Sequence, residues 1–139
     1  MSCYDEEANS IEIPTTNCKL RFEISIFAVE SIKNVTVALT IYNKNEERIV
    51  DVNTLIKGHS LSLERNKTAR VIFHLNNVRL RPDLYSVGLW MGIINNCDID
   101  GVRYATTFNF EPVREEILYT QPFPGYYNCD FYDEIILSR

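Results

Sequence analysis

Short runs of alternating apolar and polar residues recur along most of this chain. In the first run, Leu20, Phe22, Ile24 and Ile26 alternate with polar residues. Four more runs follow, and the corresponding positions are Val35, Val37, Leu39 and Ile41; Ala69, Val71, Phe73 and Leu75; Tyr85, Val87, Leu89 and Met91; and Tyr104, Thr106, Phe108 and Phe110. Side chains along a strand point alternately to its two faces, so each run predicts a half-buried strand. The recurring alternation therefore predicts an all-β fold.

Turn-forming residues separate the runs and predict antiparallel connections; they occur at residues 43–45, 57–58, 65–66, 81–83 and 98–101. A shorter strand fits at residues 48–53. Residues 54–64 lack a clear period, which predicts a loop with a short helix or an edge strand. Strands with one apolar face each pack as two antiparallel sheets, so we expect a β-sandwich. The expected core residues are Phe22, Ile24, Val37, Leu39, Val71, Phe73, Val87, Leu89 and Phe108.

The length and composition fit a single domain. With 139 residues, of which 45% are apolar and 24% charged, the chain can bury one core and has the balance of a globular protein. We expect residues 1–18 to form an N-terminal arm or edge strand and residues 19–112 to form the sandwich core. Residues 113–139 form an aromatic C-terminal segment that a small sandwich cannot easily bury by itself. This segment predicts a homodimer, with exchange of the segment between the two copies as one form of pairing.

Net charge and targeting signals restrict the partners and the compartment. The chain has 14 Lys and Arg against 19 Asp and Glu, a formal charge of -5. It lacks the basic field that attracts nucleic acid or anionic lipid. The acidic N-terminus does not resemble a secretory signal, and no stretch approaches the roughly 20 apolar residues of a membrane span. We therefore expect a soluble cytoplasmic protein with no nucleic-acid partner and no direct membrane insertion.

The four cysteines are Cys3, Cys18, Cys97 and Cys129, and they form no C-x-x-C pair. Both histidines stand apart from them, so the spacing argues against a zinc site. Reduced thiols are expected in a chain of this size that has no export signal. Cys18 precedes the first run and Cys97 follows the run that contains Trp90, so an antibody-type disulfide between the sheets is not expected.

The segment from Leu80 to Tyr85 combines a proline turn with a strand that opens on a tyrosine. Such a segment predicts a tyrosine corner, in which the hydroxyl of Tyr85 bonds to upstream backbone. The alternative is a tyrosine that is merely packed in the core.

Several segments, in this order, resemble those of one known family: Leu20–Phe27, Val35–Tyr42, Val50–Thr54, Ala69–Leu80, Pro82–Leu89 and Ala105–Phe110. Asn77, Leu80, Pro82 and Tyr85 fit the pattern asparagine, apolar, x, leucine, x, Pro-Gly-x-Tyr, with Asp83 in the place of glycine. Together these segments resemble the C-terminal carbohydrate-binding domain of Wzt-type ATPases. Those proteins are the nucleotide-binding subunits of ABC transporters that export O-antigen polysaccharide.

The resemblance implies an immunoglobulin-like sandwich that binds a completed polysaccharide and helps to select it for export. It also implies that two copies pair through their C-terminal segments. The domain would reach the transporter's membrane subunit through a parent or partner ATPase, at the inner face of the cell membrane. No G-x-x-x-x-G-K-[ST] phosphate loop occurs in this sequence, so the ATPase domain is not part of it. The chain is then either an excised domain or a separately encoded one.

One strand offers a surface that suits sugar. Beside Trp90, the other outward positions of its strand are Ser86, Gly88 and Gly92, which leave an open shelf. A flat aromatic ring covers the apolar face of a pyranose, and planar polar groups satisfy its hydroxyls. If the neighbouring strands pair as in an immunoglobulin-like sheet, the polar residues around the shelf are Thr40, Tyr42, Arg103, Thr107 and Asn109. The alternative is that the C-terminal segment or a partner subunit covers Trp90, and the next candidates are then Tyr126, Tyr127 and Tyr132.

Two acidic segments could supply a catalytic site or a metal site, and each has a simpler explanation. Asp130, Asp133 and Glu134 could supply the acid and base of a glycosidase, but a solvated acidic tail explains them as well. Residues 96–101 begin like a calcium loop, but the twelfth position is Thr107 rather than glutamate, and a turn explains them without an ion. We expect no catalytic site, metal or cofactor. The leading function is non-catalytic glycan binding; the alternatives are a structural or dimer-forming sandwich and a small glycan hydrolase.

Overall fold

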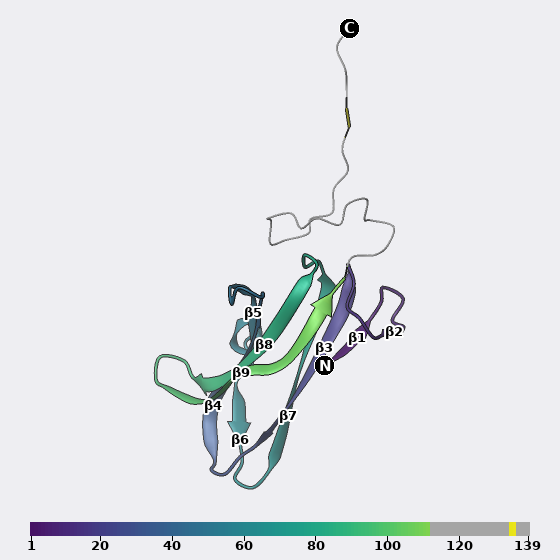
Figure 1. The fold of residues 1–139 in the computed structure, drawn as a ribbon. Helices are drawn as coiled ribbons and strands as arrows, with labels where there is room; N and C mark the ends of the chain where they lie inside the picture. Colours follow the sequence, from purple (N-terminus) through teal and green to yellow (C-terminus); the bar gives the residue numbers. More distant parts are fainter. Residues whose placement is uncertain (112–133, 136–139) are drawn as a thin grey trace.

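The chain is nearly all β and folds as an antiparallel sandwich (Figure 1). This computed structural model describes residues 1–111, 134 and 135. The strands are β1 (Ser2–Tyr4), β2 (Ser10–Ile11), β3 (Cys18–Phe27), β4 (Ile32–Tyr42), β5 (Arg48–Asn53), β6 (Leu61–Leu63), β7 (Thr68–Val78), β8 (Asp83–Ile93) and β9 (Cys97–Phe110). A short 3-10 helix, η1 (Leu55–Lys57), follows β5, so the segment without a clear period contains both a helical turn and a short strand. The predicted fold class is confirmed.

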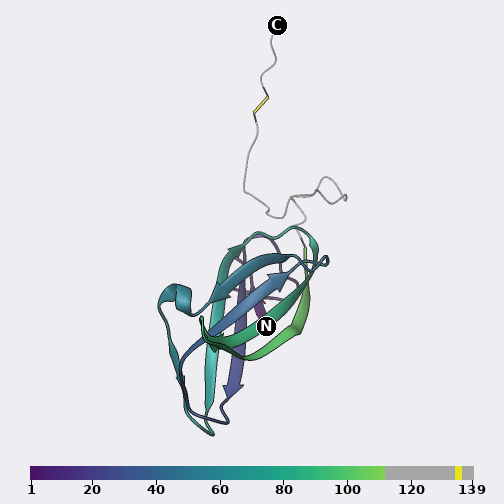
Figure 2. The same cartoon turned by 90° about the vertical axis from the view of Figure 1, so that its left-hand side faces the viewer.

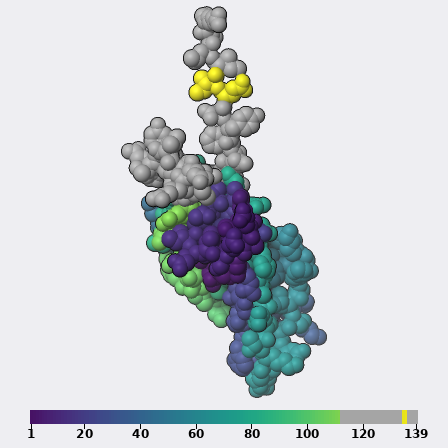
Figure 3. All heavy atoms as spheres, turned by 90° about the vertical axis from the view of Figure 1, so that its right-hand side faces the viewer, coloured from purple at the N-terminus to yellow at the C-terminus, as the bar shows by residue number. Residues whose placement is uncertain are grey.

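The strands form two sheets. One sheet has the order β2-β1-β3-β7, and the other has the order β5-β4-β8-β9, with β6 also paired to β4. Every pairing between these strands is antiparallel. β1 and β2 lie at one edge of the first sheet, and Figure 3 shows the N-terminal atoms covering that side of the molecule. The opposite edge of this sheet is β7, and β5 is an edge of the second sheet.

Apolar side chains on the facing sides of the two sheets form the core. Leu20, Leu39 and Ile41 are fully buried, and Phe110 is 2% exposed. Of the expected core residues, the buried ones are Phe22, Val37, Leu39, Val87 and Phe108, and the half-buried ones are Ile24, Val71, Phe73 and Leu89. Two of the half-buried residues lie on β7, where the sheet ends and no further described strand covers them.

The predicted tyrosine corner is confirmed. The Tyr85 hydroxyl donates to the backbone carbonyl oxygen of Arg81 at 2.6 Å. Its ring stacks on Phe108, with the ring centroids 5.6 Å apart. Burial raises the pKa of Tyr85 to about 12, because the phenolate would be poorly solvated there. The corner fixes the turn that leads into β8.

β9 is irregular in the middle of its pairing with β8. Val87 and Leu89 are two residues apart on β8, but their partners on β9, Thr106 and Val102, are four apart. The extra residues of β9 lie outside the regular ladder and form a bulge opposite Gly88. This bulge determines which side chains β9 presents to solvent.

Candidate functional site

The solvent-facing side of β4, β8 and β9, which we name the outer face, contains most of the predicted site. The strand register aligns three rows across it: Tyr42, Ser86 and Thr107; Thr40 and Gly88; and Ala38, Trp90 and Gly101. Positions two residues apart on a strand share a face, so the three rows lie on one surface. Opposite Gly88, the β9 bulge adds Arg103 and Tyr104 to this surface.

Arg103 lies at the centre of the outer face. Its guanidinium carbon is 3.4 Å from the ring centroid of Tyr42 and 4.5 Å from that of Tyr104. Its Nη1 donates to Ser86 Oγ at 3.2 Å, and its Nη2 lies 3.9 Å from the Glu46 carboxylate. A guanidinium attracts aromatic rings on both of its faces, and the polar contacts fix its orientation. Arg103 therefore holds the two tyrosine rings in one arrangement, which we name the Tyr42–Arg103–Tyr104 stack.

The absence of a side chain at Gly88 makes room for this stack. A Cβ at Gly88 would lie 3.1 Å from Cε2 of Tyr42 and 3.3 Å from the carbonyl oxygen of Arg103. Any larger residue would push against the ring and the β9 backbone. Thr40, which pairs with Gly88, is only 9% exposed, so its hydroxyl contributes little to the outer surface.

Tyr104 and Glu46 are members of the site that the sequence pattern did not identify. Tyr104 is 59% exposed, and its hydroxyl donates to Oε1 of Glu46. This hydrogen bond to a carboxylate raises the pKa of Tyr104, because it favours the protonated phenol. The alternation assigns Tyr104 an inward position, which is wrong because the bulge shifts the register of β9. Glu46 lies in the turn between β4 and β5, and no local sequence signal connects it with Tyr104.

Trp90 is half-buried on the outer face. Its Nε1 donates to Oδ1 of Asp98 at 2.8 Å. A Cβ at Gly92 would lie 2.4 Å from Cζ2 of Trp90, so the indole ring packs closely beside this glycine. The stack lies over Ser86 and Gly88, which are four and two residues from Trp90 along β8, or about 13 Å and about 7 Å on an extended strand. The indole and the Tyr42–Arg103–Tyr104 stack are therefore two separate contact points on one surface.

The remaining predicted site residues extend this surface in the other direction. Thr107 and Asn109 are exposed on β9, opposite Ser86 and Leu84. Thr107 lies in the row of Tyr42 and Ser86, and Asn109 lies beyond that row, on the side away from Trp90. The structure therefore brings Tyr42 and Arg103 together but does not gather Thr107 and Asn109 around the indole.

The acidic residues considered for other chemistry have structural partners or lie elsewhere. Asp98 accepts the indole N–H of Trp90, and Asp100 accepts the amide of Gly101 at 2.8 Å. Within the described part of the chain, His, Cys, Asp and Glu do not gather into a group of three that could hold a metal ion. Glu134 is exposed. Outside the described residues lie Asp130, Asp133, Tyr126, Tyr127 and Tyr132.

The two buried cysteines, Cys3 and Cys18, are not activated nucleophiles. Cys3 and Cys18 are buried, Cys97 is exposed, and all three are free thiols. Burial raises the pKa of Cys18 to about 12 and also raises that of Cys3. Both buried thiols therefore stay protonated near neutral pH, and a thiol is a far weaker nucleophile than a thiolate. Cys129 lies outside the described residues.

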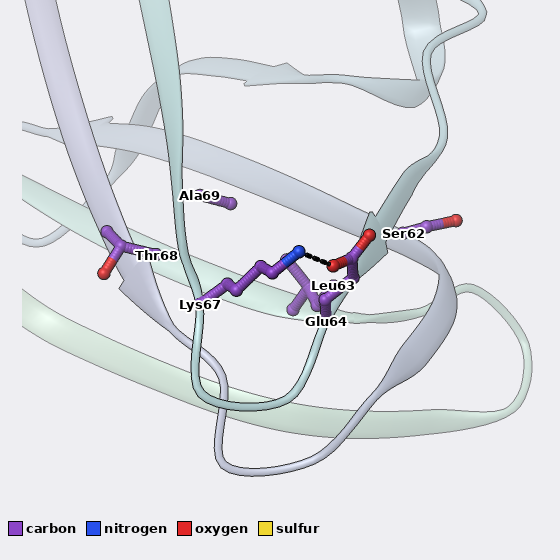
Figure 4. Close-up of a pocket in the computed structure, with 6 residues that line it drawn as sticks. All are labelled: Ser62, Leu63, Glu64, Lys67, Thr68 and Ala69. Carbon is purple, nitrogen blue, oxygen red and sulfur yellow. Dashed lines mark ion pairs between the residues drawn. The ribbon is translucent and has the colours of Figure 1, made fainter.

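Hollows away from the outer face differ in size and chemistry. A small pocket of about 200 Å³ lies at the turn between β6 and β7 (Figure 4). Lys67 and Glu64 form an ion pair there, which lowers the pKa of Glu64. This pocket has no aromatic ring to cover a sugar. A larger groove of about 1070 Å³ lies between β5, η1 and β6 on one side and β7 on the other.

The fold is a β-sandwich domain whose outer face presents a stack of aromatic and cationic side chains. The model of the Wzt C-terminal domain family matches residues 2–119. The chain belongs to this family, which is a non-catalytic domain of a transporter protein. Membership gives the chain a role in the ABC-transporter system for O-antigen export. Among the residues that the structure describes, no helix is long and apolar enough to cross a membrane.

A solved structure of this family shares the fold. The crystal structure of the C-terminal domain of Wzt is similar with a TM-score of 0.69 and 13% identity, over 96% of this chain and 80% of that one. A β-glucuronidase from glycoside hydrolase family 2 is similar with a TM-score of 0.49 and 18% identity, over 72% of this chain and 10% of that one. No curated protein sequence matches the chain. At 13% identity the likeness to the Wzt domain concerns the fold alone.

Proposed function

We propose that this domain binds a polysaccharide of the O-antigen type on its outer face, without catalysis, as part of ABC-transporter export. The family supports the role in export. The observation that carries the glycan site is the Tyr42–Arg103–Tyr104 stack. A sugar ring needs a flat apolar partner and nearby hydrogen-bonding groups, and this stack offers both. Because the rings are already fixed, binding loses little side-chain entropy.

The arrangement of the contact points allows contact with more than one sugar ring. The stack lies over Ser86 and Gly88, so Trp90 is about 7–13 Å from it along β8. A glycan chain that follows the outer face could contact both. Each neutral hydrogen bond contributes about 1 kcal/mol, so we expect weak affinity for one repeat. Two sites in a dimer would strengthen binding to a long polymer through avidity.

Trp90 provides the test, because it is the single tryptophan of the chain. We expect its fluorescence to change when the full chain is titrated with polysaccharide purified from the source cell. Tyr104→Ala should weaken binding about three- to tenfold, since it removes a stacking surface. Phe27→Ala is the matched control, because Phe27 is an aromatic residue on β3 with a similar exposure of 62%. Equal weakening by both variants would contradict a site on the outer face.

The alternatives give different results in the same titration. A purely structural or dimer-forming sandwich predicts no change in Trp90 fluorescence and no saturable binding. A small glycan hydrolase predicts that reducing ends accumulate with time, whereas we expect none. Loss of binding in Trp90→Ala with unchanged thermal stability would support a direct contact between the indole and the glycan.

The proposed assembly is a homodimer joined through residues 113–139, which lie almost wholly outside the described residues. Its membrane partner would be the transporter's membrane subunit, reached through a parent or partner ATPase at the inner face of the cell membrane. Sedimentation of the full chain at tens of micromolar should show a dimer. A monomer at that concentration would contradict the proposed pairing. It would not bear on the glycan site, which the titration with polysaccharide tests separately.

A further inference from the structure

The groove of about 1070 Å³ between β5, η1, β6 and β7, which we name the edge groove, is separate from the outer face. Figure 2 faces the side of the molecule that contains η1 and β6. The lining includes no residue of the Tyr42–Arg103–Tyr104 stack, and it does not include Trp90. The proposed glycan site therefore leaves this groove unexplained.

The floor of the edge groove is apolar and has the period of a strand. β7 contributes Val71, Phe73 and Leu75, which are half-buried and alternate with exposed residues. Across the groove, β5 contributes Val50 and Val52, which are also half-buried. A segment that places an apolar side chain in the groove at every second residue would match this floor.

The charged residues that line the edge groove are Arg48, Lys57, Arg70 and Arg79, with no Asp or Glu among the described lining residues. Arg48 and Arg70 have carboxylate partners outside the lining, Asp51 at 3.4 Å and Glu23 at 2.9 Å. Lys57 is exposed on the rim, and the described lining contains cations without an acidic residue, although the whole chain has a formal charge of -5. An occupant with acidic groups is therefore electrostatically favoured.

Unpaired strand edges border the edge groove. Within the described residues, β7 pairs only with β3 over its 11 residues, and β5 pairs only with β4. An exposed strand edge is a template for another strand, and extended peptides bind other proteins in this way. Pairing β7 with β7 of a second copy would bring together two grooves whose described lining contains cations and no Asp or Glu, so an acidic segment complements the groove better than a second copy does.

We propose that the edge groove binds an extended, acidic segment of a partner protein, which adds a strand to the free edge of β7. Its alternate apolar side chains lie on Val71, Phe73 and Leu75. Its carboxylates lie near Lys57 and the arginines of the rim. The backbone of the segment supplies hydrogen bonds, and the alternation of apolar and acidic residues supplies specificity.

The probe is a dye-labelled synthetic peptide of about ten alternating Val and Glu residues, long enough to cover most of a strand. We expect the full chain to bind it in a fluorescence anisotropy titration, and to bind a Val and Lys peptide of equal length at least about tenfold more weakly. Binding should weaken as salt is added, because salt screens the charges. Two further peptides have N-methyl groups on alternate amides, one peptide at the odd positions and the other at the even positions. Only one of the two should lose binding, since strand pairing uses alternate N–H groups.

Lys57→Glu should weaken binding of the acidic peptide about three- to tenfold, because it reverses an exposed charge on the rim. Lys19→Glu is the matched control: Lys19 is an exposed lysine on β3 that does not line the groove, and affinity should not change. Both variants should have the melting temperature of the parent chain, and Lys57→Gln, with a smaller loss, replaces Lys57→Glu if that variant is unstable.

Three results would overturn the proposal. Equal affinity for the acidic and the basic peptide would remove the electrostatic argument. Unchanged affinity for both N-methylated peptides would contradict the addition of a strand to β7. Tighter binding of a peptide that copies residues 128–139 would instead assign the groove to a segment of this chain. None of these results bears on the titration with polysaccharide, which concerns the outer face.

Discussion

The outer face and the edge groove are both open to solvent, but they differ in the state of their strands. The centre of the outer face is β4 and β8, which are paired on both sides, so contacts there involve side chains; β9 is the edge of this face. In the edge groove, β5 and β7 are each paired on one side within the described residues, so backbone groups are available as well. One sandwich can thus offer a rigid, side-chain surface suited to rings and an open backbone edge suited to a peptide. Variants that affect one region and spare the other measure how independent they are.

The largest expected effect comes from the core that supports both regions. Phe110 is 2% exposed and packs between the sheets. Phe110→Ala should lower the free energy of unfolding by about 3–5 kcal/mol, because it leaves a cavity in the core. Urea unfolding measures this change, and glycan and peptide binding should be lost at the same urea concentration. Val29→Ala, at a residue that is 72% exposed, should stay within about 0.5 kcal/mol of the parent.

Gly92→Val should disturb the outer face and spare the edge groove. The new Cβ would lie 2.4 Å from Cζ2 of Trp90 and 2.6 Å from the carbonyl oxygen of Cys97, so the indole and the turn must both shift. We expect a loss of about 1–3 kcal/mol in unfolding free energy, an altered Trp90 emission spectrum and weaker glycan binding. Affinity for the acidic peptide should not change.

Gly101→Ala is the control for this experiment, because Gly101 pairs with Trp90 on the same face. A Cβ there meets only the carbonyl oxygen of Leu89 at 3.5 Å, an ordinary contact. Gly101→Ala should therefore leave the emission spectrum of Trp90 unchanged. If it changes the spectrum as much as Gly92→Val does, the packing of the indole beside Gly92 is not what fixes its position.

Tyr85→Phe should have an intermediate effect that depends on pH. At neutral pH the variant should lose about 1–3 kcal/mol, because the carbonyl oxygen of Arg81 loses its hydrogen-bond donor. The folded pKa of Tyr85 is about 12, above its ordinary value of 10.0, so the folded state favours the neutral phenol. Its contribution is complete below pH 10 and is lost as the pH rises towards 12. Unfolding curves between pH 8 and 12 should therefore converge for the parent chain and the variant; a constant difference would contradict the buried phenol.

The smallest expected effect is that of Tyr104→Phe, which keeps the ring and removes the bond to Glu46. Tyr104 is exposed, so the unfolding free energy should change by less than about 0.5 kcal/mol. If stacking on the ring dominates glycan binding, the affinity should fall less than in Tyr104→Ala. Equal losses in the two variants would show that the hydroxyl and its fixed orientation matter more than the ring surface. Peptide binding should be the same in all three proteins.

The regular part of the fold could be predicted because period-two alternation is a local property. Leu39 and Val87 are buried as this pattern requires, and the turn before Tyr85 is fixed by residues close to it in sequence. Which strand forms the edge of a sheet is not a local property of the sequence. Val71 and Phe73 have the same alternation, yet they are only half-buried, because no described strand lies beyond β7.

The candidate site could be predicted only in part. Tyr42 on β4 lies beside Arg103 on β9, as expected for the two strands that flank β8 in one sheet. Tyr104 could not be placed correctly, because alternation assumes that β9 has no bulge. The bond from Trp90 to Asp98 depends on how the hairpin between β8 and β9 closes, which residue types alone do not specify.

The bulge in β9 also divides that strand into two parts with different constraints. Phe108 and Phe110 lie after the bulge and are buried in the core. Arg103 and Tyr104 lie within it and face solvent on the outer face. Residues in a bulge are not tied into the ladder, so their identity can change without moving the register of the buried part. The bulge therefore lets one strand present Arg103 and Tyr104 to solvent while its final residues anchor the same strand in the core.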